Sequence, residues 1–570
     1  MFNKYLIRLI RQMLGYRKNS LIIIISIIAT SAVSMLGPLF IGLSVDYILD
    51  LRFRLVVLFS IIYILVYFIN YIASKKRTFY SMITAQQVIK SLRQSMFKNL
   101  QYVPLSYYGQ KQSGQIISRI TNDAETLSEF LTFQLPQVAA GVIGIIASII
   151  IMVYLDPVLT AYAIIVIPFL LAVIAIMSGK IRYNYHEVRR KIAALTGGVS
   201  ESINGINAVK SNGAEDVFER QFESLNRNNF NANVNAVKLT SIFSSMMEII
   251  EAAGIILVLY MGGMQILSGT ISIGLVVSFV IYVQGFFTPI VQLSQFYNSY
   301  QSSSIAVERI YRIIDEPAEE NHYDVDDISL KESIKLINVD FSYNKTRVLK
   351  NISMEIKKGE KIALVGRTGA GKTTITNLIL KFYHPDSGSI LMDNIDISRI
   401  STYNYRKHFG VILQDPFLFD GTILDNIKFS NENITEEEIK NKINDLGLSE
   451  VFSGLNLHDD IGMHGNRLSE GQRQAVSILR AVIKNPDIII MDEATSELDS
   501  INEKRIQDAL LNLMADKTMI IIAHHIKTIL HTDAVYYLDN GSIVEYGNPQ
   551  ALLKKEGKFY RIYKSIYTQN

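Results

Sequence analysis

The chain of 570 residues contains no cysteine, and only 19% of its residues are charged. Without cysteine it forms neither disulfides nor thiolate metal sites, and it has no cysteine nucleophile. The net charge of +3 is too small to predict a nucleic-acid partner. No A-x-A-like cleavage site follows the first apolar run. We therefore interpret the basic N-terminus as the start of a retained membrane anchor and not as a signal peptide.

Long apolar runs dominate the first half of the chain. A helix that spans a membrane needs about 20 predominantly apolar residues, and six stretches are long enough. They are Leu21–Leu43, Leu55–Ala73, Val138–Leu155, Val158–Ser178, Ile242–Leu267 and Gly274–Leu293. The sequence therefore predicts six transmembrane helices.

The links between these runs alternate in length and charge. Those after the first, third and fifth runs are short, whereas those after the second and fourth are long and rich in Lys and Arg. This charge bias predicts a multi-pass protein of the plasma membrane whose N-terminus, long links and C-terminal half are cytoplasmic. Because the long links have helical periodicity, we expect the membrane helices to continue into the cytoplasm as hairpins. Their predicted tips lie near Tyr107–Gln115 and Gly213–Phe222.

A change of pattern divides the chain into two parts. Residues 1–314 form the predicted transmembrane domain, the acidic and polar residues 315–333 a linker, and residues 334–570 a second domain. In the second domain short apolar runs alternate with helical segments, which predicts an α/β fold on a mainly parallel sheet. The predicted strands are Ile334–Val339, Lys361–Val365, Ile488–Met491 and Met519–Ala523.

A phosphate-binding loop follows the strand Lys361–Val365. Its residues are Gly366, Arg367, Thr368, Gly369, Ala370, Gly371, Lys372, Thr373 and Thr374. In such a P-loop the glycines let backbone N–H groups converge on phosphates, and the following helix adds its N-terminal dipole. Lys372 is expected to contact the β- and γ-phosphates of ATP, and Thr373 to ligate Mg²⁺.

Two adjacent acids end the strand Ile488–Met491. Asp492 is placed to reach Mg²⁺ through its water shell, and Glu493 is the natural general base for an attacking water. Up to this point any P-loop ATPase fits the pattern.

Leu468-Ser469-Glu470-Gly471-Gln472 resembles the signature of the ABC transporter family. The resemblance implies that Ser469 and Gly471, with Gln472, bind the γ-phosphate of an ATP held by the opposite subunit. It makes Gln414 the glutamine that senses γ-phosphate and Mg²⁺, and it places Asp499 at the end of the D-loop. By the same resemblance His524 is the switch histidine, and Tyr343 is the aromatic residue that stacks on adenine.

The sequence departs from the usual family pattern at several positions. The signature has Glu470 where Gly is most common, and the D-loop has Glu497 where Ala is usual. Met463-His464-Gly465 precedes the signature where such exporters often have Glu-Arg-Gly, and His524 is followed by His525-Ile526-Lys527 in place of Arg-Leu-Ser. In paired exporters one chain often carries an altered signature, so Glu470 leaves a heterodimer open.

Two acidic side chains in the fifth apolar run could influence which substrates the protein binds. Glu248 and Glu251 are spaced to share a helix face, where they could attract cationic amphiphiles. The plainer interpretation is that they lie at the cytoplasmic edge of the span, solvated or paired with Lys238.

Together these features identify the chain as a half-size ABC exporter of the type IV, multidrug or lipid kind. The expected fold is an α-helical membrane domain with long cytoplasmic extensions, followed by an α/β P-loop ATPase domain. We expect a homodimer that binds ATP and Mg²⁺, lies in membrane lipid and expels amphipathic compounds by alternating access. The alternatives are the catalytic half of a heterodimer, a dedicated peptide or lipid exporter, and an ATP-gated channel or regulator.

Overall fold

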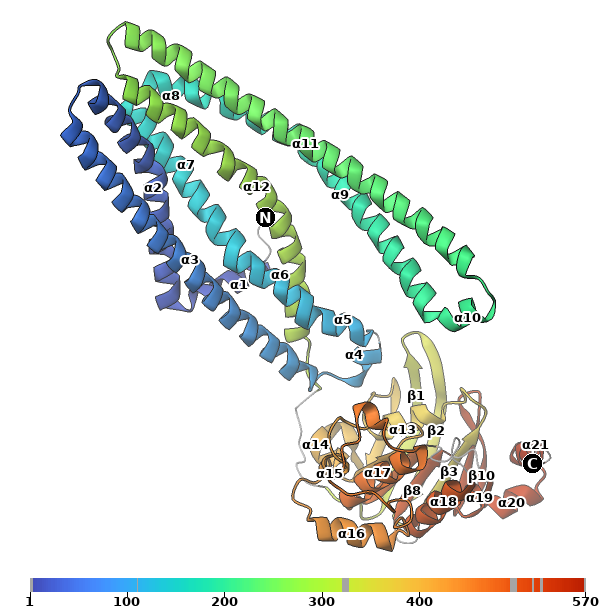
Figure 1. Ribbon diagram of the computed structural model, residues 1–570. Coiled ribbons are helices and arrows are strands. Elements are labelled where there is room, and N and C mark those ends of the chain that lie inside the picture. The colour runs from blue at the N-terminus through green and yellow to red at the C-terminus, as the bar shows by residue number, and fades with distance from the viewer. Residues whose placement is uncertain are drawn as a thin grey trace. The chain divides into compact units, whose positions relative to one another are not determined.

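The computed structural model describes residues 4–109, 111–319, 328–492, 500–514, 517–522 and 526–567 (Figure 1). The chain divides into two compact units, which we describe separately. The first comprises residues 1–101 and 113–316, and the second comprises Tyr102–Gln112 and the residues from Pro317 onward. The predicted limits differ from these units, because they assign Tyr102–Gln112 to the transmembrane domain and Asp315 and Glu316 to the linker.

The first unit is built of helices, several of them very long. They are α1 (Lys4–Leu14), α2 (Arg17–Leu49), α3 (Phe53–Leu100), α5 (Ser113–Ser118), α6 (Ala124–Glu129), α7 (Leu135–Leu155), α8 (Pro157–Ile164), α9 (Val166–Asn204), α10 (Ile206–Ser211), α11 (Glu215–Leu267) and α12 (Ile273–Ile314). Two π-helical turns, Arg119–Asp123 and Phe130–Gln134, connect α5, α6 and α7. Among the described residues, six helical stretches are long and apolar enough to cross a membrane, as the sequence predicts.

Hydrogen bonds of two aspartates fix the starts of helices α8 and α12. Asp156 caps α8 by accepting a hydrogen bond from the backbone N–H of Leu159 at 2.7 Å. Asp46 of α2 accepts bonds from the Ser272 hydroxyl at 2.6 Å and the Gly274 N–H at 2.7 Å, which fixes the start of α12. The predicted first tip overlaps the short helix α4 (Leu105–Gly109). The predicted second tip extends too far, because the turn is confined to residues 212–214 and α11 already begins at Glu215.

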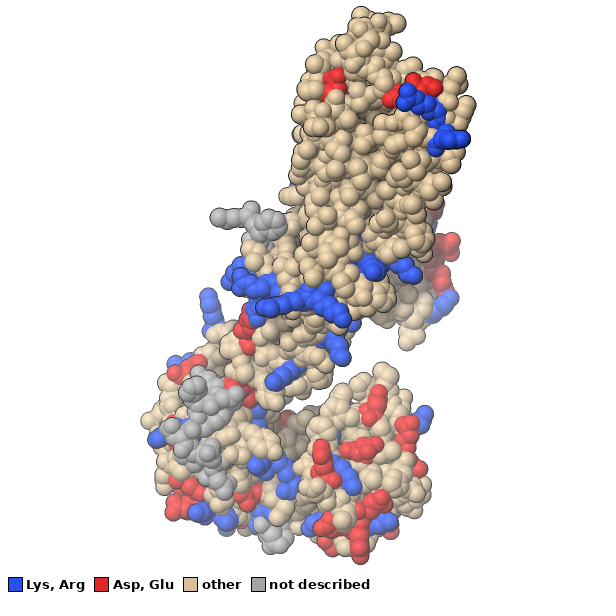
Figure 2. Space-filling view, turned by 90° about the vertical axis from the view of Figure 1, so that its left-hand side faces the viewer, with Lys and Arg blue, Asp and Glu red and all other residues tan. Residues whose placement is uncertain are grey.

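Apolar side chains cover the middle of the first unit. Figure 2 shows few charged residues there, and Lys and Arg gather beyond one end of this apolar zone. The exposed large side chains include Ile64 and Phe68 of α3 and Ile256 of α11. A lipid environment accounts for such exposure, and the basic border agrees with the positive-inside distribution.

The second unit contains a mainly parallel sheet, as predicted. Its strand order is β10-β9-β3-β8-β7-β6, and β9 and β10 are the antiparallel pair. The strands are β3 (Lys361–Gly366), β6 (Phe409–Ile412), β7 (Ile488–Asp492), β8 (Thr518–Ile522), β9 (Ala534–Asp539) and β10 (Ser542–Gly547). Strand β3 is buried on both faces, because Ala363 packs in one apolar core and Ile362 in the other.

A second, antiparallel sheet was not predicted. It has the order β2-β1-β4-β5, with β1 (Ser333–Tyr343), β2 (Thr346–Lys357), β4 (Ser387–Met392) and β5 (Ile395–Asp396). The predicted strand Ile334–Val339 belongs to this sheet and not to the parallel one. Along β2 buried and exposed residues alternate, which is typical of an antiparallel strand that is covered on one face.

Helices complete the second unit. They are α13 (Lys372–Ile379), α14 (Thr402–Arg406), α15 (Ile423–Lys428), α16 (Glu436–Asp445), α17 (Glu470–Ile483), α18 (Ser500–Met514), α19 (Ile526–Leu530), α20 (Pro549–Lys554) and α21 (Lys558–Tyr567). Helix α17 contributes many fully buried residues to the larger core, among them Ala475, Val476 and Leu479.

Candidate nucleotide-binding site

The loop between β3 and α13 has the backbone that a phosphate site needs. Gly369 and Gly371 adopt φ values of 81° and 107°, which favour glycine. A Cβ at Gly371 would lie 2.6 Å from Cδ2 of Leu349, whereas a Cβ at Gly369 would meet no atom within 4 Å. Arg367, Thr368 and Gly369 are exposed and Ala370 is buried. The outer side of the loop is therefore open to a ligand.

Lys372 lies over this loop. Its side chain is buried, and its ammonium donates to the carbonyl oxygens of Gly366 at 2.8 Å and Arg367 at 3.2 Å. Thr373 is exposed, whereas Thr374 is buried behind it. The helix N-terminus, the lysine and the open glycine loop together fit a polyphosphate.

The predicted metal ligands lie at one edge of the parallel sheet. Asp492 ends β7, and Gln414 follows the end of the neighbouring strand β6 by two residues. Because β3 runs parallel within the same sheet, its P-loop lies at the same carboxyl edge. A threonine hydroxyl, an amide oxygen and a carboxylate are the hard oxygen donors that Mg²⁺ prefers, so the donor set fits this ion.

The signature residues cap helix α17. The Ser469 hydroxyl accepts from the N–H of Gln472 at 3.3 Å, and the Gln472 side chain accepts from the N–H of Ser469 at 2.9 Å. This reciprocal pair is a capping box, which satisfies backbone donors at the helix start. Ser469 is exposed and Gly471 is buried. The predicted phosphate-binding serine thus stands at a pre-formed helix N-terminus.

Glu470, the unusual residue of the signature, is paired within its own helix. Its carboxylate forms an ion pair with Arg473, and Arg473 also donates to the carbonyl of Leu468 at 3.1 Å. Arg473 therefore compensates the negative charge that Glu470 adds near a phosphate site.

Tyr343 ends β1 beside the P-loop helix. Its hydroxyl accepts a bond from the side chain of Asn377 in α13 at 3.4 Å. Its ring meets those of Phe341 and Tyr383 edge to face, with centroids 4.8 and 5.1 Å apart. Tyr343 is partly exposed, so part of this aromatic group is open to solvent.

Three further predictions lie outside the described residues. They concern Glu493, the D-loop with Asp499, and His524. Glu493 directly follows β7 in the sequence, and His524 follows the end of β8 by two residues. Their roles remain predictions from the sequence.

Sequence reasoning missed a buried glutamine in α17. Gln474 is 2% exposed, and its amide donates to the carbonyls of Leu413 at 3.2 Å and Gln414 at 2.7 Å. It therefore ties the signature helix to the loop that carries Gln414. The available signal was a glutamine between apolar positions of a helix, because a buried polar side chain needs partners.

The comparisons with known proteins agree with this geometry. Family models match the ABC transporter transmembrane region over residues 20–290 and the ABC transporter domain over residues 349–496. An ABC transporter ATP-binding protein of Bacillus subtilis is 33% identical over 98% of this chain and 94% of its own. A fatty acid ABC transporter ATP-binding/permease protein of Mycobacterium tuberculosis is 30% identical over 84% of this chain and 76% of its own.

A solved structure extends the comparison to the fold. A bacterial Atm1-family ABC exporter with ATP bound matches with a TM-score of 0.80 at 24% identity, over 96% of this chain and 98% of that chain. The six apolar helices, the P-loop and the signature all lie in segments that the matching relatives share. The chain therefore belongs to the ABC transporter family, as an exporter that fuses a transmembrane region to an ATP-hydrolysing domain.

Proposed function

We propose that the chain exports amphipathic small molecules or lipids by ATP-driven alternating access, as a dimer with two ATP sites between its subunits. The observation that supports the dimer is that the two predicted phosphate-binding motifs lie at the starts of two different helices. The P-loop leads into α13, and Ser469 of the signature caps α17. Because the ABC signature serves an ATP held by the opposite subunit, a second copy would complete each site.

The site residues have distinct proposed roles. Lys372 and the loop Gly366–Thr374 hold the phosphates, and Tyr343 supports adenine. Thr373, Asp492 and Gln414 hold Mg²⁺, which neutralises phosphate charge when bound. Glu493 accepts the proton of the attacking water, while Ser469 and Gly471 meet the γ-phosphate held by the partner.

The pairing of Glu470 favours a homodimer over a heterodimer. A signature that is altered by an uncompensated charge would suit a degenerate site, but Arg473 pairs with this carboxylate. The matched relative from M. tuberculosis is named a fatty acid transporter, which supports an amphipathic substrate. We place the protein in the plasma membrane, with its N-terminus and ATPase unit in the cytoplasm.

The test is Mg-ATPase activity of this chain expressed alone in lipid, with particle mass determined in parallel and Glu493→Gln as the control. Hydrolysis by a two-copy particle that is lost in the variant is the expected result. A silent or monomeric chain would contradict the homodimer. Transport of an amphiphile against its gradient, measured in sealed vesicles, separates a pump from an ATP-gated channel.

A further inference from the structure

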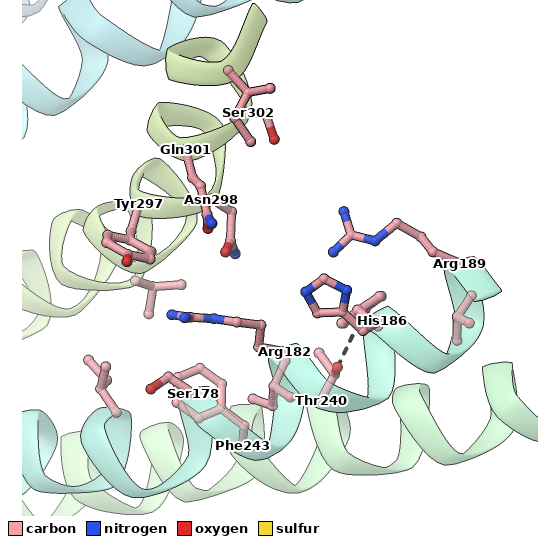
Figure 3. Close-up of a pocket in the computed structure, with 16 residues that line it drawn as sticks. Ser178, Arg182, His186, Arg189, Thr240, Phe243, Tyr297, Asn298, Gln301 and Ser302 are labelled. Atoms are coloured by element: carbon pink, nitrogen blue, oxygen red, sulfur yellow. Dashed lines mark hydrogen bonds between the residues drawn. The ribbon is translucent and has the colours of Figure 1, made fainter. Parts of the chain in front are cut away.

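A cavity of about 770 Å³ lies in the first unit between helices α9, α11 and α12 (Figure 3). This volume is within the range of small-molecule sites. The Tyr185 hydroxyl of α9 lies 3.5 Å from the Thr240 hydroxyl of α11, which joins these two helices along one wall. Tyr297 and Gln301 of α12 line the facing wall.

One wall of the cavity carries basic residue types. Arg182, His186 and Arg189 all line it from α9, and their spacing of four and three residues places them on one helix face. Figure 3 shows these three side chains extending into the space opposite Asn298 and Gln301 of α12. In the part of the chain that the structure describes, no Asp or Glu lines the cavity.

No ion pair between described residues involves Arg182 or Arg189. Among the described residues the nearby Glu187 pairs with Arg190, at 3.3 Å, and that arginine is not part of the lining. The guanidinium of Arg182 instead lies 5.0 Å from the centroid of the Tyr297 ring. Arginine donors that face a cavity without an acidic partner suit an oxyanion, because their charge-assisted hydrogen bonds are the strong ones.

The other end of the cavity is apolar. Ile174, Phe243 and Val291 line it, and each lies at the end of a predicted membrane span. Along α9 the lining continues from Ile174 to Arg189 and includes the apolar Ile181 and Val188, so the basic side chains lie in the part farther from the span, beside apolar ones. An amphiphile would thus find its tail and its head matched in one site.

We infer that this cavity is the substrate site and that it takes an amphiphile with an anionic head, a carboxylate or a phosphate. The inference rests on the proposed export function and names its substrate class. Glu248 and Glu251, which could attract cationic amphiphiles, are absent from the cavity lining. A cation beside Arg182 and Arg189 would be repelled.

Equilibrium binding to the full-length protein in nanodiscs of zwitterionic lipid, without nucleotide, tests the inference. The probes share one fluorescent long-chain tail and carry a carboxylate, a phosphate or a trimethylammonium head. We expect both anionic probes to bind at least about tenfold more tightly than the cation. A preference for the carboxylate would indicate a free fatty acid, and a preference for the phosphate a lipid head group. Equal affinity of all three, or preference for the cation, would overturn the inference.

Substitutions test whether the arginines of the cavity cause the preference for anions. The double substitution Arg182→Gln with Arg189→Gln should weaken anion binding about tenfold, and the matching Lys pair should restore most of it. Arg190→Gln removes one positive charge from the same helix outside the cavity, and binding should stay within about twofold. An equal loss in the Arg190 variant would show that the general surface charge matters and not the cavity. Inorganic phosphate should fail to compete, because it lacks a tail, and full competition by it would contradict an amphiphile site.

These outcomes are separable from those of the proposed function. If the unaltered protein showed neither ATPase activity nor transport of any probe, export would be refuted. The binding measurements would still decide the charge preference of the cavity. ATP-driven transport of the cationic probe that is insensitive to Arg182→Gln would refute the anionic site and leave the exporter standing.

Discussion

The amide of Gln474 donates to the backbone carbonyl of Gln414 at 2.7 Å. A side chain of the signature helix thus positions the loop that carries a predicted Mg²⁺ ligand. Because both groups belong to the second unit, a displacement of α17 would be passed directly to this loop.

Replacing Gln474 with the apolar Met should uncouple the loop. The carbonyls of Leu413 and Gln414 lose a part-buried hydrogen bond, which costs about 0.5–1.5 kcal/mol. We expect kcat for ATP hydrolysis to fall about tenfold or more while the Kd for ATP changes less than threefold. Gln550→Met on exposed α20 is the matched control and should behave as wild type. An unchanged kcat in Gln474→Met would show that the bond has no positioning role.

Removing the charge of Arg473 should lower ATPase activity, and removing the charge of Glu470 as well should restore it. Arg473→Gln leaves the carboxylate near the incoming phosphates without its partner, so we expect ATPase activity to fall severalfold. Arg473→Gln combined with Glu470→Gln should recover activity, and Glu470→Gln alone should have little effect. Steady-state ATPase rates of the four proteins form a double-mutant cycle. Purely additive effects would mean that the pair does not compensate charge at the site.

Ser469→Arg should abolish ATP hydrolysis and leave ATP binding to the P-loop intact. The bulky cation replaces the exposed hydroxyl, and loss of the helix cap costs about 1 kcal/mol in addition. Nucleotide binding measured by a fluorescent ATP analogue, beside Lys372→Met as the binding-deficient control, checks both halves of the prediction. A joint loss of binding and hydrolysis in Ser469→Arg would argue against a site shared between two chains.

Asp340 connects three strands of the antiparallel sheet and should make stability depend on acid. Its hydrogen bonds with the Arg347 side chain, the Asn351 N–H and the Ser387 hydroxyl lower the pKa of this carboxyl to about 2. Because the pKa is depressed, the stabilisation is complete above the unfolded value of about 3.9 and is lost as pH falls toward 2. Asp340→Asn should therefore lower Tm at pH 7, and the difference from wild type should shrink between pH 4 and pH 2. A difference that is independent of pH would exclude the ionised carboxylate as its source.

The contact between α2 and α12 should not tolerate a side chain. A Cβ on Gly274 would lie 2.0 Å from the carbonyl oxygen of Gly42, so Gly274→Ala forces the helices apart at a cost of about 1–3 kcal/mol. Gly285→Ala lies on the same helix with no atom within 4 Å of its new Cβ. We expect a Tm several degrees lower for Gly274→Ala only, measured by thermal unfolding in detergent. Equal Tm values for the two variants would contradict the close packing.

Features that depend on local sequence could be predicted, namely the six apolar helices, the P-loop and the parallel strands. The signals are the length of the apolar runs, the spacing of the glycines and the short apolar runs of strands that are buried on both faces. Each can be counted from neighbouring residues. The antiparallel sheet was missed because Ile334–Val339 has the composition of any buried strand, and only its partners β2 and β4 define its place.

Contacts between distant residues also decided the details of the site. The sequence of the signature could not reveal that Gln474 reaches a loop 60 residues earlier. The cavity between α9, α11 and α12 likewise depends on helices that are far apart in the sequence. Glu248 and Glu251 do not line it, and the role of this pair stays a prediction from the sequence.

The capping box of α17 has a consequence for how a phosphate would be received. The Ser469 hydroxyl serves its helix as an acceptor from Gln472, and a hydroxyl keeps its own proton for another bond. The serine can therefore donate to a phosphate oxygen without releasing its helix, so its orientation is already restricted before the ligand arrives. Asp at this position would preserve the cap but offer the phosphate a negative charge in place of a donor.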